Sequence, residues 1–546
     1  MVGAEGSPDV EEHEDGHTSL VQGLPSTLPA ATTGNNGSWN ITIVPARVLS
    51  PPRLSYSEKG ITASNGAWNI TTVKFHKGAQ VKSWWIMLVM DSAARNTIVS
   101  GPQDSRLLAL RDSFVSKLTN CGMTMPRDKP VPFATPLLPT GTDKFRKDAL
   151  GTIRTTLQNQ LDSARGQKPD FVLVLLSHED NFIYPGIKTI GDVEMGLNTI
   201  HLQLDRAING KRQDQYLSNV ALKINTKLGG VNHQLDQEAM NWLKAERTML
   251  VGIDVTHCGP GSKEGAPSIA AVVANVDDTF VQYPASLEIQ QTHEIREVSP
   301  LRVIIGWRVL TVNPTQMVTE LEKMMVERLQ AYKFRTGNLP ERVFIFRDGV
   351  SEDQYDQVVL CEELPRILHA FKRFKTKDRK QPYRPRLSIV ICVKQHHTRF
   401  YPIQAEDADT TMNTRPGIVV DKGVTGVFDF DFYLQAHAGL QGSVKSTHYV
   451  VIYDENRFAA DEIQQGINNN SYLYARATRA VSLIPPAYYA GQASKRGRYY
   501  LNDFLTGEDP QKEKVEKAAK EKVFEDAKKA WGGGVHPDMR DTMFYI

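Results

Sequence analysis

Apolar residues occur along this chain in short blocks separated by amphipathic stretches, and their spacing predicts an α/β protein. The blocks KSWWIMLVM (82–90) and DFVLVLLSH (170–178) are short and nearly continuous, as expected of strands buried on both faces. Between them, RLLALRDSFVSKLTNCG (106–122) has helical spacing and is expected to end at Gly122. Strands alternating with helices predict a parallel α/β layer over residues 83–215.

The alternation returns after Gly229 and Gly230, which are expected to end a helix. Five apolar blocks then predict strands, and two longer amphipathic stretches predict helices. The strands are expected at 248–255, 267–276, 285–291, 342–348 and 387–393, and the helices at 317–334 and 355–374. These elements predict a second α/β unit within residues 216–546.

The first part of the chain has a different pattern. Residues 1–38 are rich in Gly, Ser, Thr, Asn and acids, a composition that predicts a disordered tail. Residues 39–82 hold short apolar pieces broken by Pro and Gly, which predicts an extended linker segment lying on a larger body.

Composition narrows the class of protein without naming a partner. At 546 residues the chain is long enough for about three or four domains. The 64 basic and 62 acidic residues leave a net charge of +2. The longest apolar runs are too short to span a bilayer, and the first residues lack the apolar core of a secretory signal. We therefore expect a protein of the cytoplasm, with the nucleus as the alternative, that has no membrane span.

Cysteines and clustered basic residues add local information. Cys121, Cys258, Cys361 and Cys392 show no CxxC spacing, which excludes the usual zinc-finger pattern and predicts no disulfide. Residues 371–386 hold eight Lys or Arg against one acid. Such a run is usually a solvated loop, and the alternative is a surface that follows a phosphate backbone.

Two expected strands end on a carboxylate: TMLVGIDV runs into Asp254, and RVFIFRD runs into Asp348. If these strands are parallel neighbours, both carboxylates lie at the sheet edge where α/β proteins bind ligands. Neighbouring carboxylates raise each other's pKa unless a cation neutralises them, and their oxygens suit Mg²⁺ or Mn²⁺. The pattern fits a two-metal phosphodiester hydrolase. For either aspartate alone, a turn or helix-cap residue is the alternative.

Six motifs follow one another in a fixed order: GIDVTH, PSIAAVV, FRDGVSEDQ, HHTRFYP, FDFYLQAHAGLQGSVKSTHY and PPAYYA. Together they resemble the PIWI domain of eukaryotic Argonaute proteins, and the resemblance runs from about Val48 to the final TMFYI. It implies a MID domain with a parallel, Rossmann-like sheet over 83–215, which binds the 5′ end of a guide, and an RNase H-like PIWI domain over 216–546. It also implies that 39–82 is an interdomain linker. The implied partners are a small guide RNA, a complementary target RNA and proteins of a silencing complex.

The resemblance also implies a guide-binding pocket. Tyr184 and Lys188 match the family's Y-x-x-x-K, and Lys223 and Lys227 match its K-I-N-x-K-L-G-G. In the family these residues surround the 5′-phosphate, and the tyrosine stacks on the first base. Lysines suit a terminal phosphate, and a flat ring suits an unpaired base. For Lys223 and Lys227 taken alone, a solvated pair on one helix face is the alternative.

Further pocket residues follow from the same resemblance. The family often has a glutamine on the intervening segment, where LNTIHLQL offers Thr199, His201 and Gln203, and Thr199 or His201 is the expected substitute. Arg476 and Arg496 match the family's guide-phosphate arginines.

The family's third catalytic acid is a mobile glutamate, and the family pattern around it matches this chain only when a segment is left out. Deleting residues 298–316 restores the family pattern as IREMVTELEKMM and places Glu297 at the acid's position, with Glu294 as the second choice. The resemblance thus implies Asp254, Glu297 and Asp348 as catalytic acids, with Asp254 and Asp348 holding Mg²⁺ or Mn²⁺.

We hypothesise that the atypical insertion 298–316 is a translated intron. Codons for its initial Val-Ser can read as a splice donor, those for Leu310-Thr311 as a branch point, and the codon for its final Gln as an acceptor. The alternative is a genuine surface insertion, which loops tolerate well.

The resemblance leaves two functions open, and the residue at position 491 bears on the choice between them. Active family members usually carry His or Asp directly after AYYA, whereas Gly491 has no side chain to offer, and His448 is expected to be structural. The first function is a guide-directed endoribonuclease, and the second is a guide-loaded platform that recruits partners without cutting. A third reading, an unrelated RNase H-like nuclease such as a transposase, gives no reason for the tyrosine–lysine group.

Overall fold

The structure is a computed structural model that describes residues 42–92, 98–139, 143–208, 210, 213–259, 262–291, 317–375, 381–505 and 517–546. Residues 46–546 form one unit. The expected disordered tail, the glutamates Glu294 and Glu297, and the insertion 298–316 lie outside the described residues.

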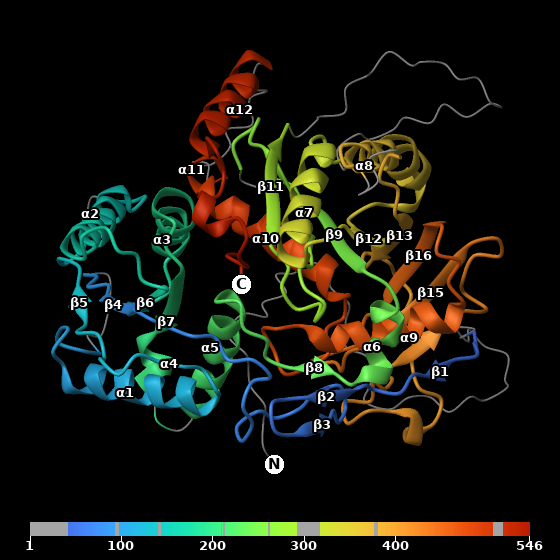
Figure 1. Ribbon diagram of the computed structural model, residues 1–546, viewed down its shortest axis with the longest axis horizontal. Coiled ribbons are helices and arrows are strands. Elements are labelled where there is room, and N and C mark those ends of the chain that lie inside the picture. The colour runs from blue at the N-terminus through green and yellow to red at the C-terminus, as the bar shows by residue number, and fades with distance from the viewer. Residues whose placement is uncertain are drawn as a thin grey trace, which may run out of the picture. The chain divides into compact units, whose positions relative to one another are not determined.

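A four-stranded parallel sheet lies in the first half of the unit, in the order β5 (Phe133–Ala134), β4 (Trp84–Leu88), β6 (Phe171–Leu176), β7 (Thr199–Gln203). The alternation of side chains along β4 explains its two helical layers. Ile86 and Leu88 pack with α1 (Ser105–Asn120) and α5 (Gln213–Lys227), whereas Met87 packs with α2 (Lys147–Ser163) and α3 (Ile183–Thr189) (Figure 1). The predicted parallel α/β layer is therefore confirmed.

The second half is built on a nine-stranded mixed sheet. Its central strands, β9 (Thr248–Thr256), β12 (Arg342–Asp348) and β13 (Arg386–Val393), are mutually parallel. The flanking strands are antiparallel to their neighbours: β10 (Ser268–Ala274) and β11 (Ala285–Gln290) beyond β9, and β16 (Thr447–Asp454), β15 (Phe430–Gln435), β14 (Ile418–Val420) and β1 (Arg47–Val48) beyond β13. All five predicted strands are present, and β14 to β16 are additional to them.

Helices cover both faces of this sheet. Met249, Val251 and Ile253 of β9 pack with α7 (Leu321–Thr336), α8 (Leu364–Lys372) and the π-helical η4 (Tyr355–Glu363). The other face carries α10 (Pro485–Tyr500), whose first turn lies directly on β9. A Cβ atom at Gly252 would stand 1.9 Å from the carbonyl oxygen of Pro486, so only glycine permits this approach. The contact fixes α10 beside the carboxyl end of β9.

The expected linker segment contributes to two sheets. Its β1 extends the nine-stranded sheet, and β2 (Arg53–Ser55) pairs with β3 (Gly60–Thr62) and β8 (Gln234–Leu235). The remaining elements are η1 (Ile190–Met195), α4 (Leu204–Ile208), α6 (Gln237–Lys244), η3 (Glu352–Gln354), η5 (Ala405–Asp407), α9 (Ala460–Asn470), η6 (Ser471–Leu473), α11 (Asn502–Leu505), α12 (Lys517–Trp531) and η7 (Pro537–Met539).

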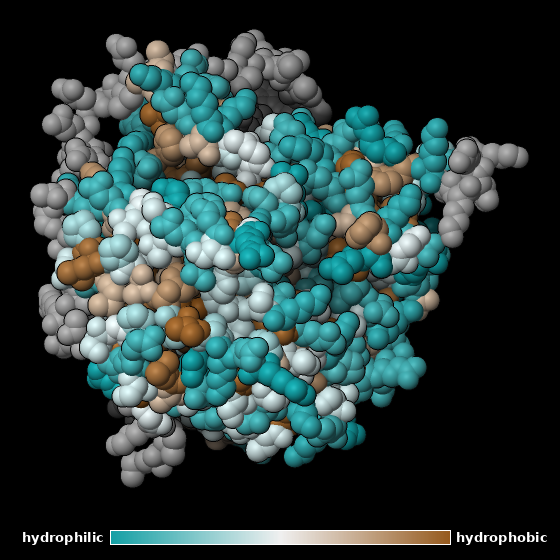
Figure 2. Space-filling view, turned by 60° about the vertical axis from the view of Figure 1, so that its left-hand side comes forward, coloured by the Kyte–Doolittle hydropathy of each residue, from teal (hydrophilic) through white to brown (hydrophobic). Residues whose placement is uncertain are grey.

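In the part of the chain that the structure describes, no helix is long and apolar enough to cross a bilayer. The face shown in Figure 2 is mainly hydrophilic, with hydrophobic side chains in small groups. All four cysteines lie among the described residues, and none forms a disulfide.

Candidate functional site

Asp254 and Asp348 lie on adjacent parallel strands at the same edge of the nine-stranded sheet. The register pairs Arg347 with Ile253, which places the two aspartates at the next position of each strand. The geometry that the sequence predicted is therefore present. Both side chains supply the hard oxygen ligands that divalent cations prefer.

The pKa of Asp348 is raised in this arrangement. Burial, followed by the charge of Asp254, raises the pKa of Asp348 to about 7, against the opposing effect of Lys394. Like charges of this kind are stabilised when a cation binds between them. The chemistry of the pair thus fits a divalent metal.

Helix α10 brings two further residues to Asp254. The hydroxyl of Ser494 donates to Oδ2 of Asp254 at 2.7 Å, and Gly491 precedes it by one turn. A Cβ atom at Gly491 would lie 3.8 Å from the same oxygen. Gly491 therefore occupies the position at which a fourth ligand could reach the pair, and Ser494 is a residue that sequence reasoning did not identify.

The histidines near these strands have other partners. His257 Nδ1 lies 3.0 Å from the hydroxyl of Ser268, and burial lowers the pKa of His257. His448 Nε2 lies 2.6 Å from Oδ2 of Asp431, and its ring stacks on Tyr433 at 4.3 Å. His448 is thus a structural residue, as expected.

A second group of side chains, mostly cationic, lies together between α3, β7, α5 and α10, where the resemblance implies the guide pocket. Lys188 is buried and its Nζ donates to the carbonyl oxygen of Thr199 at 2.7 Å and to the Thr199 hydroxyl at 3.1 Å. Lys227 is only 2% exposed and donates to the carbonyl oxygen of Phe544 at 2.8 Å. The alternative of a solvated lysine pair is therefore wrong for Lys227.

Arg496 completes the pocket from α10. It donates to Asp192 Oδ2 and to the carbonyl oxygen of Phe544, both at 2.8 Å, and to that of Tyr545 at 3.2 Å. The hydroxyl of Tyr500 also donates to Asp192, at 2.9 Å. Asp192, Tyr500 and the last residues of the chain were not identified from the sequence as pocket residues, and no local motif marks them.

His201 and Tyr184 lie together beside Lys188. The two rings meet edge to face, with centroids 4.7 Å apart, and Lys188 Nζ lies 5.6 Å from the centre of the Tyr184 ring. Both ring nitrogens of His201 are inaccessible to solvent and have no hydrogen-bond partner within the described part of the chain. The Thr199 hydroxyl, in contrast, already accepts a hydrogen bond from Lys188.

The other expected pocket residues differ in their placement. Lys223 and Arg476 both act electrostatically on Lys227. Gln203 instead donates to Glu179 Oε1 at 2.6 Å, so its amide is already engaged outside the phosphate cluster.

The excess of cationic side chains in the pocket favours binding of an anion. Burial, with the charges of Lys227, Arg496 and Lys223, holds the pKa of Lys188 well below its usual value, and burial lowers that of Lys227 to about 7. Asp192 is the acid among the charges acting on these two lysines. An anion with several acceptor oxygens would restore their charged state, and a terminal phosphate is such a group.

The basic run at 371–386 behaves as a solvated, paired surface where it is described. Arg373 pairs with Glu322, Arg384 with Glu455, and Arg386 with Glu246. Residues 376–380 lie outside the described part.

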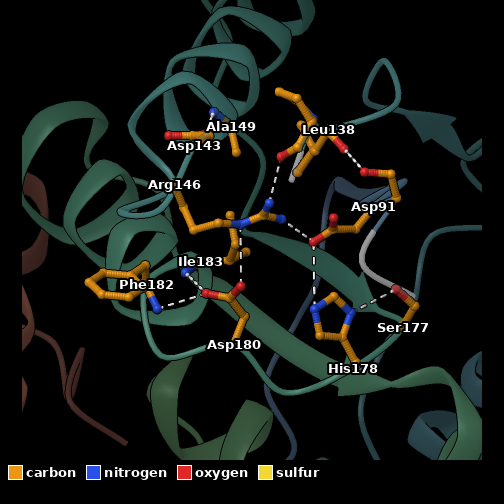
Figure 3. A network of polar contacts seen from close by, with 12 residues as sticks. Asp91, Leu138, Asp143, Arg146, Ala149, Ser177, His178, Asp180, Phe182 and Ile183 are labelled. Atoms are coloured by element: carbon orange, nitrogen blue, oxygen red, sulfur yellow. Dashed lines mark hydrogen bonds and ion pairs between the residues drawn. The ribbon is translucent and has the colours of Figure 1, made fainter. Parts of the chain in front are cut away.

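One further group of metal-type ligands lies away from both sites. Among the described residues, ligand atoms of Asp91, His178 and Asp180 lie within 4.8 Å of one another at the edge of the four-stranded sheet. The guanidinium of Arg146 points between the two aspartates (Figure 3). Arg146 thus already pairs with both carboxylates of this group, which does not form part of the Asp254–Asp348 centre.

Comparison with known proteins identifies the family of this chain. Residues 171–502 match the Piwi domain family. The chain is 35% identical over 468 residues to Protein argonaute 1B of Oryza sativa subsp. japonica, covering 84% of this chain and 39% of that protein. It is 32% identical over 483 residues to Protein argonaute 5 of Arabidopsis thaliana, covering 87% of this chain and 44% of that protein. The chain spans less than half the length of these curated relatives.

Solved structures give the same result. The C-terminal lobe of a budding yeast Argonaute superposes with a TM-score of 0.73 and 26% identity, covering 92% of this chain and 95% of that one. Kluyveromyces polysporus Argonaute with a guide RNA gives the same score and identity, covering 92% of this chain and 57% of that one. The resemblance expected from the motifs is confirmed, and so is the RNase H-like fold, which typically uses divalent metal ions.

Proposed function

Because the chain belongs to the Piwi domain family, we propose that it binds the 5′-phosphate of a small guide RNA and silences complementary target RNA. The observation that carries this proposal is the cationic pocket. Lys188 and Lys227 are buried together beside Arg496, and the one acid among the side chains that act on both lysines is Asp192. A folded chain gathers buried cations in this way at a high desolvation cost, which a bound phosphate offsets.

The test compares guides that differ only at the 5′ end. Lys188→Ala or Lys227→Ala should weaken binding of a 5′-phosphorylated guide more than that of a 5′-hydroxyl guide. Each lost charged contact should cost on the order of 1.5–3 kcal/mol. Lys333→Ala, an exposed lysine on α7, is the matched control and should change neither affinity. Equal losses for both guides would remove the assignment of the pocket.

Asp254 and Asp348 form the proposed metal centre. Their oxygens would hold Mg²⁺ or Mn²⁺, and Glu297 is the proposed third acid. When bound, the ions would activate water and stabilise the leaving 3′-oxygen of a target. The residues of this chain that act on the centre are Ser494, which orients Asp254, and Lys394, which lowers the pKa of Asp348.

The second candidate is a guide-loaded platform that recruits silencing-complex proteins and does not cut. Gly491 favours it, because the chain offers no side chain at this position of α10, where a Cβ atom would lie 3.8 Å from Asp254 Oδ2. We propose that guide-dependent target binding is intact and that cleavage is weak or absent. Single-turnover cleavage of a complementary target in Mg²⁺ separates the two candidates.

A further inference from the structure

Arg146 joins three segments at the carboxyl edge of the four-stranded sheet. Its guanidinium donates to Asp91, which follows β4, and to the carbonyl oxygen of Pro139 at 2.6 Å. Its Nε lies 3.3 Å from Oδ2 of Asp180, which follows β6 (Figure 3). The side chains of Arg146 and Asp91 are only 6% and 3% exposed, so this charge pair is held inside the protein.

Asp180 in turn caps α3, the helix that carries Tyr184 and Lys188. Its Oδ1 accepts the backbone N–H groups of Phe182 and Ile183, both at 2.8 Å. A capping carboxylate satisfies donors that a helix start leaves unpaired. One oxygen of Asp180 therefore holds the first turn of α3, while the other faces Arg146.

A ring contact reinforces the ion pair. Phe145 meets Phe182 edge to face, with centroids 5.8 Å apart. Arg146 itself adopts φ = 56°, a left-handed conformation that non-glycine residues seldom adopt and that the surrounding contacts must hold in place. Two consecutive residues, Phe145 and Arg146, thus clamp the segment that begins α3.

The rest of α3 is fixed independently of this clamp. A Cβ atom at Gly186 would stand 2.2 Å from Leu150, so the middle of α3 lies against α2. Lys188 is held by its two bonds to Thr199. The part of α3 that depends on Arg146 is therefore its first turn, which contains Tyr184.

We infer that Arg146 is a positioning residue for the first nucleotide of the guide: acting through Asp180, it sets the Tyr184 ring against which the first base stacks. This inference rests on the proposed function. It separates the two tasks of α3, because base stacking depends on the Arg146–Asp180 pair and phosphate binding depends on Lys188 and Lys227.

The test uses two 5′-phosphorylated guide RNAs of the same sequence, one with its first base and one abasic at that position. Tyr184→Ala should remove the preference for the base-bearing guide, which stacking makes on the order of tenfold. Arg146→Gln should reduce that preference by roughly threefold or more, and leave the affinity for the abasic guide unchanged. Arg146→Lys keeps the charge and should restore part of the preference.

A second variant guards against misfolding, since Arg146→Gln leaves Asp91 buried without its partner. Asp180→Asn keeps an oxygen to cap α3 and keeps the Asp91–Arg146 pair, but it loses the ion pair to Arg146. It should reduce the base preference in the same direction. Arg154→Gln is the matched control: Arg154 lies on α2, which begins directly after Arg146, pairs with Glu194 at 2.6 Å and is 47% exposed. It should leave both affinities unchanged.

Double-substitution cycles decide between positioning and a general structural role. Asp180→Asn and Tyr184→Ala should be non-additive, whereas Asp180→Asn and Lys227→Ala should be additive. The inference is overturned if Asp180→Asn preserves the full base preference, or if it weakens both guides equally. If the unsubstituted chain does not distinguish 5′-phosphate from 5′-hydroxyl, the proposed function fails and the inference fails with it. If it does distinguish them while the base preference survives Asp180→Asn, only the inference fails.

Discussion

Gly491 stands beside Asp254 with room for a side chain: its Cβ would lie 3.8 Å from Asp254 Oδ2, an ordinary contact, and no closer atom intervenes. Gly491→Asp should therefore place a third carboxylate at the metal centre without a clash. We expect it to raise Mg²⁺-dependent target cleavage by roughly 10- to 100-fold, the range over which changes around a metal alter its site. Single-turnover cleavage by the two proteins is the measurement.

Asp348→Ala is the control for this experiment, and it should abolish any cleavage in both backgrounds. Strong cutting by the unsubstituted chain would show that a fourth ligand is dispensable. If Gly491→Asp stays inactive while guides still load, the displacement of Glu297 by residues 298–316 becomes the cause of inactivity.

His201 makes guide binding depend on pH. Burial and the charges of Lys188, Arg496 and Lys227 hold the pKa of His201 well below 6.5 in the empty pocket. A bound phosphate adds negative charge and raises that pKa, so binding is accompanied by proton uptake. Binding therefore strengthens as the pH falls through the raised pKa of the guide-bound state, and the gain stops below the lower pKa of the unbound state.

His201→Gln isolates this contribution. The phosphate itself titrates near pH 6, and Lys227 is present in both proteins, so these effects cancel in the ratio of affinities. The ratio of unsubstituted to His201→Gln affinity for a 5′-phosphorylated guide should rise as the pH is lowered. A ratio that is constant with pH would contradict a role for the imidazolium.

The contribution of the buried Arg347–Glu363 ion pair to the stability of the sheet beneath the metal centre can be measured. Both side chains are 1% exposed and lie 3.0 Å apart, and Glu363 Oε1 also accepts the backbone N–H of Val318 at 3.1 Å. Glu363→Ala removes the carboxylate that pairs with this buried guanidinium, so it should lower the free energy of unfolding by about 3–5 kcal/mol in urea denaturation. Glu362→Ala, at an exposed pair with Arg366, should cost at most about 0.5 kcal/mol. Similar losses in the two variants would show that Glu363 is not needed as a partner.

The described residues on either side of the segment that contains 298–316 lie next to each other. Gln290 Nε2 donates to the carbonyl oxygen of Met317 at 2.8 Å, and its Oε1 accepts the N–H of Thr319 at 3.2 Å. After deletion of 298–316, residues 291–297 still span this short gap easily. We expect the deletion variant to fold with an unchanged thermal midpoint and to bind divalent metal more tightly, because the deletion restores the family's sequence pattern after Glu297.

Two results would count against this expectation. A large loss of thermal stability would show that the insertion is part of the fold. A mature transcript that retains the coding sequence for 298–316 would end the intron hypothesis, whatever the behaviour of the deletion variant.

The sequence predicted the metal-type aspartates because their signal is local. An apolar run that ends on Asp254 or Asp348 contains both the strand and its carboxylate, and the parallel pairing of β9 with β12 followed. Tyr184 and Lys188 were likewise predicted from a short motif, and the two side chains lie together, with Lys188 Nζ 5.6 Å from the centre of the Tyr184 ring.

Other features depend on residues far apart in the chain. Lys227 looked like one of a solvated pair because its acceptor, the Phe544 carbonyl, lies more than 300 residues away. α10 was not predicted as a helix, since PPAYYAGQASKRGRYY lacks the usual apolar stripe. That helix packs small residues on the sheet and turns its polar ones into the two sites, so tertiary contacts determine its pattern.

Helix α10 belongs to both sites at once. Ser494 bonds to Asp254, and two residues later Arg496 bonds to Asp192, while Gly252 holds the start of the helix on β9. A helix fixed in this way transmits a displacement at one end of the pair to the other. If the two sites bind a guide and a metal ion as proposed, the two are linked ligands, and thermodynamics makes their coupling free energy reciprocal. The factor by which a bound 5′ end changes the affinity for metal is the factor by which metal changes the affinity for the guide. Binding of either ligand can therefore be detected through the affinity for the other.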